Sequence, residues 1–320
     1  MADGTHVAEA RILVSGASGF IGANLVRALR ARRASVQAVV RAGSAGWRLR
    51  GLDDLALHDG DLTDRRSVEA IVSRVRPDAI VHLGTPSGHP RGAGERDTLL
   101  RASVLGTHHL LEAACEAGVK RFVHVCSSTV YGPGSAPYRE SDPPAPTSFR
   151  GAAKAAAAQL CRSAVVAGQP VVVVRPFVVY GQWQARDRFI PTAIRAALRG
   201  RPMALTVPGL RRDWIHVSDV VEGCLAALVV PDIVGEVINL GTGLDHSNEE
   251  VVELVEDVTG RRIAAAPGAY PTQPSDRPEW RADICKAGQL LGWSPRHDLR
   301  SGLEVTVEWF RAHERLFAQA

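Results

Sequence analysis

The sequence has few of the features that mark secreted or membrane proteins. Its five cysteines are odd in number, lie far apart and include no C-x-x-C pair, which argues against a disulfide framework and predicts reduced thiols. No apolar run approaches the ~18 residues that a membrane-spanning helix needs. The opening MADGTHVAEA lacks the cationic head and apolar middle of a secretory signal peptide. We therefore expect a cytoplasmic protein with no membrane partner.

Concentrated positive charge is also scarce. The net charge is +4, and the arginines are scattered, with no run of five or six cations and no stripe of interleaved aromatic residues. We therefore expect a small-molecule partner and no nucleic-acid partner. The histidines show neither the spacing nor the neighbouring carboxylates of a metal site, so we predict no bound metal. Lysine is rare: the chain has only three, Lys120, Lys154 and Lys286.

Short apolar runs alternate with longer helical patterns over the first 175 residues. The runs are rich in Val and Ile on both faces, which is typical of parallel strands covered by helices on either side. This pattern predicts an α/β fold with a doubly wound parallel sheet. The expected strands are 11–16, 36–41, 54–61, 79–84, 121–128 and 171–176, and the expected helices are 20–33, 64–75, 95–117 and 150–167.

The alternation loosens after residue 176, and no Gly/Ser linker marks a separate domain. We expect residues 1–176 to form a dinucleotide-binding core and residues 177–320 to form mainly a smaller substrate-binding lobe, with residues 217–243 returning to the core. The elements expected in this part are helices 188–199, 217–229 and 247–260 and strand 236–241.

The segment GASGFIG follows the first expected strand and opens the first expected helix. Its glycines allow a tight turn and a close approach to a diphosphate, which is then held at the positive end of the helix. The spacing is one residue longer than G-x-G-x-x-G, and a plain glycine-rich turn is the alternative. We predict a dinucleotide site made by Gly16, Ser18, Gly19, Phe20, Ile21 and Gly22.

The second expected strand ends in Arg41, with Ser44 close behind, where an NAD site would have an acidic residue. A guanidinium fork suits a 2′-phosphate, which favours NADP(H) as the cofactor. A surface arginine beside bound NAD is the alternative. The segment GDLTD would place Asp61 and Leu62 beside the adenine.

Several motifs along nearly the whole chain resemble those of the extended short-chain dehydrogenase/reductases, the family of sugar-nucleotide epimerases, dehydratases and reductases. They are GASGFIG, GDLTD, LGTHHLLEAACEAGVKRFVHVCSSTVYG, RPFVVYG, RRDWIHVSDV, INLGTG and ADICKAGQLLGW. The resemblance implies a Rossmann core and hydride transfer with nicotinamide. It also implies cofactor contacts from Leu83, Lys154, Pro176 and Phe177, and a homodimer formed through the helices at 95–117 and 150–167.

The family's catalytic Ser/Thr and Lys match Ser127 and Lys154 here, but its tyrosine position is Arg150. Tyr131 belongs to the family's structural V-Y-G turn, and Ser103 stands where the family has a supporting Asn. A guanidinium stays protonated and has no acceptor lone pair, so Arg150 cannot relay protons near neutral pH. Arg150, Ser127 and Lys154 are nonetheless the residues that we expect to carry the chemistry.

The direction of the reaction follows from this loss. Oxidation of an alcohol needs a base to take the proton, whereas reduction of a ketone mainly needs stabilisation of the developing oxyanion. We therefore expect an NADPH-dependent ketoreductase. The alternatives are a nucleotide-sugar 4-ketoreductase, epimerase or dehydratase, and a catalytically inactive NADP-binding protein.

The substrate side departs from the family as well. The family's pyrophosphate-binding Asn is Val178 here, one of its arginines is retained as Arg212, and the other is replaced by Gln273 or Ser275. Because these pyrophosphate contacts are missing, we expect a ketone without a pyrophosphate, of the aromatic polyketide class. Phe177 and Trp214 are among the aromatic residues that could line its pocket. The expected substrate contacts are Ser128, Thr129, Val178, Trp183, Phe189 and Arg212.

Overall fold

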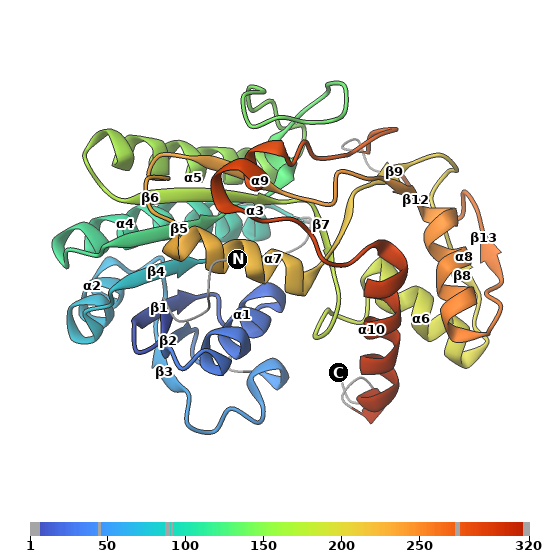
Figure 1. Cartoon of the computed structure of the whole chain (residues 1–320), viewed down its shortest axis with the longest axis horizontal. Helices are drawn as coiled ribbons and strands as arrows, with labels where there is room; N and C mark the ends of the chain where they lie inside the picture. The colour runs from blue at the N-terminus through green and yellow to red at the C-terminus, as the bar shows by residue number, and fades with distance from the viewer. Residues whose placement is uncertain (1–6, 44–45, 87–89, 91, 273–275, 316–320) are drawn as a thin grey trace.

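One parallel sheet of seven strands forms the centre of the protein (Figure 1). The computed structural model describes residues 7–43, 46–86, 90, 92–272 and 276–315. The strand order is β11-β6-β5-β4-β1-β2-β3, and neighbouring strands are parallel throughout. The strands are β1 (Arg11–Ser15), β2 (Ser35–Val40), β3 (Ala56–Asp59), β4 (Ala79–His82), β5 (Arg121–Val125), β6 (Val171–Pro176) and β11 (Val237–Leu240).

Helices cover both faces of this sheet. Along β1, Ile12 and Val14 pack into the apolar layer under α1 (Phe20–Ala31), α7 (Val217–Val229) and α9 (Cys285–Leu291). Leu13 points to the opposite layer, under α2 (Arg65–Val75), α4 (Gly106–Glu116) and α5 (Phe149–Val166). Two buried faces explain why the strands read as continuous apolar runs. The predicted doubly wound α/β fold is confirmed.

The order of the strands reverses between β1 and β4, whose carboxyl ends lie side by side. In open parallel sheets, ligands bind in the crevice beyond the strand ends at such a reversal. The helix expected over 95–117 is divided into α3 (Ala93–Leu100), a π-helical segment (Arg101–Leu105) and α4. Short 3-10 helices occupy Trp47–Leu49 and Ser128–Val130.

Side-chain caps fix the start of four α-helices, one of which is α10 (Leu299–Ala312), capped by Asp298. Asp64 accepts a hydrogen bond from the Arg66 amide at the start of α2, and Ser148 accepts one from the Gly151 amide at the start of α5. Ser247 and Glu250 form a capping box at α8 (Asn248–Thr259). Such caps satisfy amides that lack partners inside the helix. The cap at Ser148 sets the position of Arg150 and Lys154 on α5.

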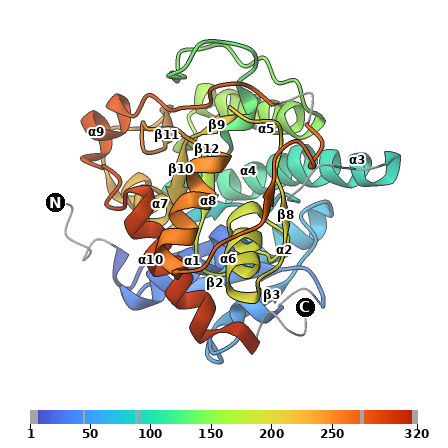
Figure 2. The ribbon, with the colours of Figure 1, turned by 90° about the vertical axis from the view of Figure 1, so that its right-hand side faces the viewer.

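The rest of the chain packs as an outer lobe around α6 (Phe189–Arg199), α8 and α10 (Leu299–Ala312), which lie together in Figure 2. α7 and β11 belong to the central layers, with β11 paired to β6. Three small two-stranded sheets complete the lobe and its connection to the core: β7 (Val178–Tyr180) with β10 (Trp214–His216), β9 (Arg211–Arg212) with β12 (His246–Ser247), and β8 (Met203–Ala204) with β13 (Ala265–Ala266).

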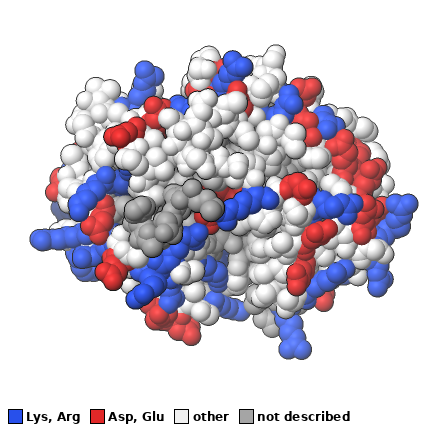
Figure 3. Space-filling view, in the orientation of Figure 1, with Lys and Arg blue, Asp and Glu red and all other residues white. Residues whose placement is uncertain are grey.

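The surface and the cysteines show few special features. Figure 3 shows Lys and Arg interspersed with Asp and Glu over the face seen in Figure 1. All five cysteines are free thiols.

Among the described residues, no helix is both long and apolar enough to cross a membrane. Within the same residues, no group of three or more His, Cys, Asp and Glu side chains is arranged to hold a metal ion.

Candidate active site

The glycine-rich loop connects β1 to α1 and is closed by contacts that tolerate no side chain. The Gly19 amide donates to the Gly16 carbonyl over 2.9 Å, and Gly16 has a left-handed φ of 72°. A Cβ on Gly22 would lie 2.2 Å from the Gly16 carbonyl oxygen, and one on Gly16 would lie 2.7 Å from the backbone of Leu83. Gly19, as N-cap, offers α1 no side-chain cap. The open amides of this helix end fit a diphosphate, as the sequence predicts.

The other residues expected around the cofactor follow the carboxyl edge of the sheet. Ser18, Phe20 and Ile21 lie in the glycine-rich loop and the first turn of α1. Leu83 directly follows β4, and its amide donates to the Ser15 carbonyl of β1. Pro176 ends β6, and the amide of Phe177 donates to the Leu240 carbonyl of β11. Their contacts with a bound dinucleotide, and that of Lys154 with its nicotinamide end, stay predictions.

Arg41 directly follows β2 and is exposed. Asp61 is exposed too, and its carboxylate accepts hydrogen bonds from the amide (2.8 Å) and the hydroxyl (2.9 Å) of Thr63, so part of its role is to hold this turn. Ser44 lies outside the described residues. The contacts of Arg41 and Asp61 with a bound cofactor stay predictions.

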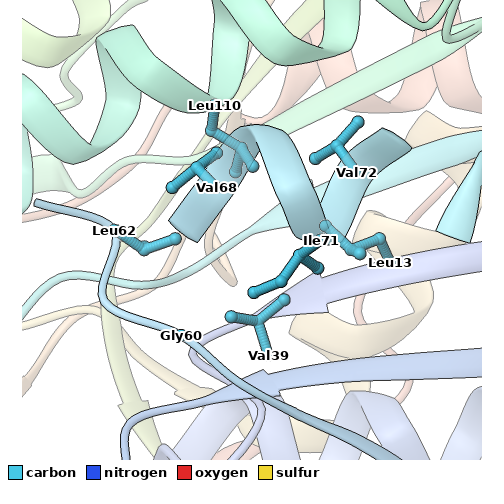
Figure 4. A pocket seen from close by; sticks show the side chains of 8 residues that line it. All are labelled: Leu13, Val39, Gly60, Leu62, Val68, Ile71, Val72 and Leu110. Atoms are coloured by element: carbon cyan, nitrogen blue, oxygen red, sulfur yellow. The ribbon is translucent and has the colours of Figure 1, made fainter. Parts of the chain in front are cut away.

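A small gap lies beneath Leu62 (Figure 4). Its lining consists of Gly60 and Leu62, which follow β3, and of apolar side chains from β1, β2, α2 and α4, namely Leu13, Val39, Val68, Ile71, Val72 and Leu110. None of these side chains can make a hydrogen bond to a substrate. The gap therefore belongs to the hydrophobic core, and the candidate active site lies elsewhere, at the ends of β4, β5 and β6.

Lys154 is buried on α5, with 3% of its surface exposed, and its Nζ donates to the Val125 carbonyl over 3.1 Å. Burial, with a smaller contribution from Arg150, lowers the pKa of Lys154 to about 8. Ser127 follows β5, and its Oγ accepts from the amide (3.2 Å) and the hydroxyl (3.0 Å) of Thr129. Because both lone pairs of Ser127 Oγ are used, its own proton is left to donate to another oxygen.

Arg150 lies one helical turn before Lys154, where the family resemblance expects tyrosine. Its Nε is buried without a hydrogen-bond partner. Burial lowers the pKa of Arg150, and the positive charge of Arg188 adds to that effect. The charges of Cys126, Lys154 and Arg188 act on Arg150 or respond to it, and within the described part of the chain no carboxylate forms an ion pair with Arg150.

Three of the four tyrosine hydroxyls are hydrogen-bonded within the protein. The Tyr131 hydroxyl donates to Asn239 Oδ1 over 2.7 Å and accepts from Arg175 Nη1 over 2.9 Å, and burial raises the pKa of Tyr131 to about 12. The hydroxyls of Tyr138 and Tyr180 donate to the carbonyls of Gly132 and Leu299. Tyr270, 55% exposed, follows β13 in the outer lobe. Tyr131 is thus a structural residue.

A buried polar cluster lies behind the site, and its extent was not predicted. The ring of His82 contacts Ser15 Oγ (2.6 Å) and Thr107 Oγ1 (2.9 Å). Thr107 gives its own proton to the Ser103 carbonyl, so His82 donates from Nε2 and accepts at Nδ1. Burial lowers the pKa of His82 to about 3.

His124, on the neighbouring strand, has a ring centroid 5.2 Å from that of His82. Both of its ring nitrogens and the Ser103 hydroxyl are buried without partners among the described residues. Burial lowers the pKa of His124 far below its usual value. The only sequence signal for this cluster was one histidine in each of two expected strands, 79–84 and 121–128.

Three of the expected substrate contacts have protein partners that restrict them. Arg212 Nη2 donates to Asp276 Oδ1 over 3.0 Å, and its Nη1 donates to the carbonyls of Arg211 and Arg277. Ser128 Oγ accepts from Trp280 Nε1 over 3.0 Å. The ring of Trp183 lies 5.0 Å from that of Trp309 and 5.6 Å from that of Trp47. The structure thus gives these three residues packing or pairing roles, and substrate contacts from them stay predictions.

The remaining expected substrate contacts lie on different elements. Thr129 bonds Ser127 directly, and Val178 lies half-buried at the start of β7. Phe189 stacks on Trp214 with ring centroids 5.4 Å apart, so both aromatic residues pack together at the start of α6. Gln273 and Ser275, the expected replacements for the second arginine, lie outside the described residues.

Known proteins resemble this chain over almost its whole length. Residues 12–241 match the NAD dependent epimerase/dehydratase family. The dTDP-glucose 4,6-dehydratase of Neisseria meningitidis serogroup B is 31% identical, covering 94% of this chain and 93% of the relative. MoeE5, solved with UDP-glucose and NAD and also with UDP-glucuronic acid and NAD, is 35% identical with a TM-score of 0.84, covering 94% of this chain and 99% of MoeE5.

An epimerase of the methanogen Methanothermobacter thermautotrophicus has a TM-score of 0.89 at 26% identity, covering 99% of this chain and 96% of that protein. The family match spans both the glycine-rich loop and the segment that carries Ser127 and Lys154. A nicotinamide dinucleotide is therefore the cofactor class for the site described above. This chain belongs to the NAD dependent epimerase/dehydratase family.

Proposed function

We propose that this protein reduces a keto group on a nucleotide-linked sugar, using NADPH. The similar proteins include a dTDP-glucose 4,6-dehydratase and MoeE5, which was solved with UDP-glucose. These relatives support a nucleotide-sugar substrate, the alternative given in the sequence analysis, over the aromatic ketone that the sequence analysis favoured. The observation that supports the proposal is the set Ser127, Lys154 and Arg150: the first two match the family's catalytic serine and lysine, and Arg150 stands at its tyrosine position.

The three side chains suit reduction better than oxidation. When bound, a reduced nicotinamide supplies hydride. Ser127 has a proton to donate to the substrate carbonyl, since Thr129 uses both lone pairs of its oxygen. The charges of Lys154 and Arg150 stabilise negative charge that develops on that oxygen, and their partial burial strengthens the effect. Arg150 stays protonated and cannot take a proton from an alcohol, and Lys154 can do so only in its neutral form, the minor form at pH 7 because its pKa is about 8.

NADPH is proposed in preference to NADH on the strength of Arg41. The residue follows β2, the strand whose end carries an acidic residue in proteins that bind the ribose hydroxyls of NAD. A guanidinium at this position favours a phosphate on the ribose. Since MoeE5 was solved with NAD, the preference of this chain requires direct measurement.

The test is a pair of assays on the purified protein. We expect NADPH oxidation with dTDP- or UDP-linked 4-keto sugars, and no NADP+ reduction with dTDP-glucose or UDP-glucose. Ser127→Ala should lower kcat about 10- to 100-fold, because one donor to the oxyanion is lost. Arg41→Ala should weaken NADPH binding about tenfold and leave NADH binding unchanged. A tight NADPH complex that turns over no ketone would identify a binding protein and would overturn the proposal.

A ketone of the aromatic polyketide class is the second candidate. The observation in its favour is Arg212, whose guanidinium is bound to Asp276 and two backbone carbonyls and so has fewer donors left for a diphosphate. NADPH oxidation with a panel of polycyclic aromatic ketones, combined with no binding of dTDP or UDP, would select this candidate.

A further inference from the structure

Three of the six tryptophans lie together where the outer lobe meets the segment that follows β2. Trp47 begins the 3-10 helix after β2, Trp183 follows β7, and Trp309 lies on α10. The ring centroids of Trp47 and Trp183 are 5.6 Å apart, and those of Trp183 and Trp309 are 5.0 Å apart. Such distances are typical of favourable contacts between aromatic rings. These three residues, the tryptophan cluster, therefore join α10 to the segment after β2.

The middle member of the cluster, Trp183, is held in an unusual conformation. Its φ of 66° is left-handed, which a bulky residue rarely adopts. Two residues of α1 hold it there: the guanidinium carbon of Arg27 lies 4.0 Å from the Trp183 ring centroid, and Asn24 Nδ2 donates to the carbonyl of Gln182 over 3.0 Å. A strained backbone persists only where its surroundings fix it. The contact between the outer lobe and α1 is therefore a built part of the fold.

Arg48 connects this cluster to the glycine-rich loop. Its guanidinium carbon lies 4.6 Å from the ring centroid of Trp47, and its Nε donates to the Trp183 carbonyl over 2.7 Å. Its Nη1 donates to the carbonyl of Ser18, within the glycine-rich loop, over 3.5 Å. Arginine can make these contacts together because its planar fork stacks on aromatic rings while its nitrogens donate. One side chain thus touches the loop, the segment after β2 and the outer lobe.

The charge of Arg48 also favours an anion near the loop. Within the part of the chain that the structure describes, no carboxylate forms an ion pair with Arg48, and the acceptors of its Nε and Nη1 are carbonyls. Burial lowers the pKa of Arg48, the charge of Arg188 adds to this effect, and the charge of Asp187 opposes it. A partly buried charge acts more strongly than one in water. The diphosphate expected at the loop carries the opposite charge.

We propose that Arg48 positions the glycine-rich loop for the dinucleotide, and that the tryptophan cluster makes cofactor affinity depend on the outer lobe. Arg48 is held from the lobe side by the Trp183 carbonyl. A loop that is already held in its binding arrangement loses less freedom when the cofactor binds, so the affinity is higher. By linkage, the bound cofactor stabilises the contact with α10 by the same free energy. The inference goes beyond the proposed function, because it holds for any ketone.

The first test measures the dissociation constants of NADPH and NADH by calorimetry. Arg48→Gln should weaken both cofactors about tenfold and by the same factor, because both contain the diphosphate that the loop is expected to hold. Trp309→Ala should weaken both about fivefold, although Trp309 belongs to the outer lobe. Trp309→Phe should restore most of the affinity, since it keeps an aromatic ring. A loss confined to NADPH in Arg48→Gln would assign Arg48 to the ribose phosphate and would overturn its positioning role.

Two further variants serve as controls. Arg48→Lys keeps the charge without the forked donors and should still weaken both cofactors about threefold; wild-type affinity would reduce the role of Arg48 to its charge and would overturn positioning. Glu308→Ala changes the exposed residue next to Trp309 on α10 and should leave both constants unchanged. A loss in Glu308→Ala as large as that in Trp309→Ala, or no loss in Trp309→Ala, would overturn the dependence on the tryptophan cluster.

The second test uses the wild-type protein and so does not depend on how a variant folds. Saturating NADPH should slow amide hydrogen exchange about fivefold in α10 as well as in the loop between β1 and α1. Slowing confined to that loop would overturn the coupling to the outer lobe. A wild-type protein that binds neither dinucleotide would overturn both this inference and the proposed function.

Discussion

At the scale of single residues, Arg150 decides what the site can do. The side chain shares a helix face with Lys154, and its Nε has no partner that would fix it in another role. A phenol at this position would lie beside the Lys154 ammonium, which favours the phenolate and so supplies a base. The same pocket could then oxidise alcohols.

Arg150→Tyr is therefore expected to gain activity. With NADP+ and a nucleotide-linked hexose, the variant should form NADPH at least about tenfold faster than the wild-type protein, since a positioned general base contributes a factor of this order or more. Arg150→Phe is the control that removes the charge without adding a hydroxyl. A wild-type protein that already oxidises the hexose as fast as Arg150→Tyr would show that another group serves as the base.

The buried histidines predict acid sensitivity. The pKa of His82 is lowered to about 3 and that of His124 is also lowered, both mainly by burial, whereas an unfolded histidine titrates near 6.5. Below pH ~6.5 the unfolded state therefore binds more protons than the folded state, and stability falls as the pH falls. At pH 5 His82 alone should reduce the free energy of unfolding by about 2 kcal/mol relative to pH 7.

His124→Phe isolates the second histidine. Neither ring nitrogen of His124 has a hydrogen-bond partner among the residues that the structure describes, so an aromatic ring of similar size should cost little at pH 7. Urea unfolding at pH 7 and pH 5 should show a smaller loss of stability for the variant than for the wild-type protein. If the two losses are equal, His124 is already protonated in the folded state or is bonded to water that holds its charge.

At the scale of secondary-structure elements, the β1–α1 junction depends on the absence of a side chain at Gly22. A methyl group there would lie 2.2 Å from the Gly16 carbonyl oxygen, so the helix would have to move away from the loop. Gly22→Ala should lower the free energy of unfolding by about 1–3 kcal/mol and weaken cofactor binding by at least about tenfold. Gly94→Ala in α3, where a Cβ would meet no atom within 4 Å, is the control. Unchanged NADPH affinity in Gly22→Ala would contradict this account of the loop.

The elements that local pattern controls were predicted well. The helix expected over 150–167 is α5, Phe149–Val166, because Ser148 provides a cap and the following residues favour helix. α10 was missed, although Asp298 caps it and Leu299, Leu303, Val307 and Phe310 show a helical spacing. The π-helical segment around Ser103 was predicted as part of one continuous helix. A single wider turn does not change the spacing of the apolar residues enough to be recognised in the sequence.

The parts of the site that depend on distant residues were predicted poorly. Arg212 pairs with Asp276, 64 positions along the chain, and Trp183 packs against Trp47 and Trp309. Neither partner can be chosen from sequence spacing, because the fold alone brings them together. Ser127 and Lys154 were easier, since each follows from a motif at a strand end or on a capped helix. The positions of motif residues in the fold could therefore be predicted, whereas their roles stay predictions and their side-chain partners could not be chosen from the sequence.

At the scale of the whole molecule, α4 and α5 present an outward face that suits a second copy of the chain. Ala152, Ala156 and Ser163 are small exposed residues on one row of α5, which Gln159 interrupts. Leu100 and Leu105, each 40% exposed, lie on the adjoining helices. Val166, 86% exposed, lies at the end of α5. Apolar side chains gathered on one face commonly mark an interface. We expect a homodimer through this face, with two-fold symmetry.

The dimer is tested by light scattering after size exclusion. The wild-type protein should show about twice the 34.3 kDa mass of the chain. Ala156→Arg, on the exposed row of α5, should shift the mass toward the monomer, because two copies of the new charge would face each other across a two-fold axis. Ala204→Arg, exposed on β8 in the outer lobe, should leave the mass unchanged. A monomeric wild-type protein, or a dimer that Ala156→Arg does not weaken, would place any self-association on a different surface.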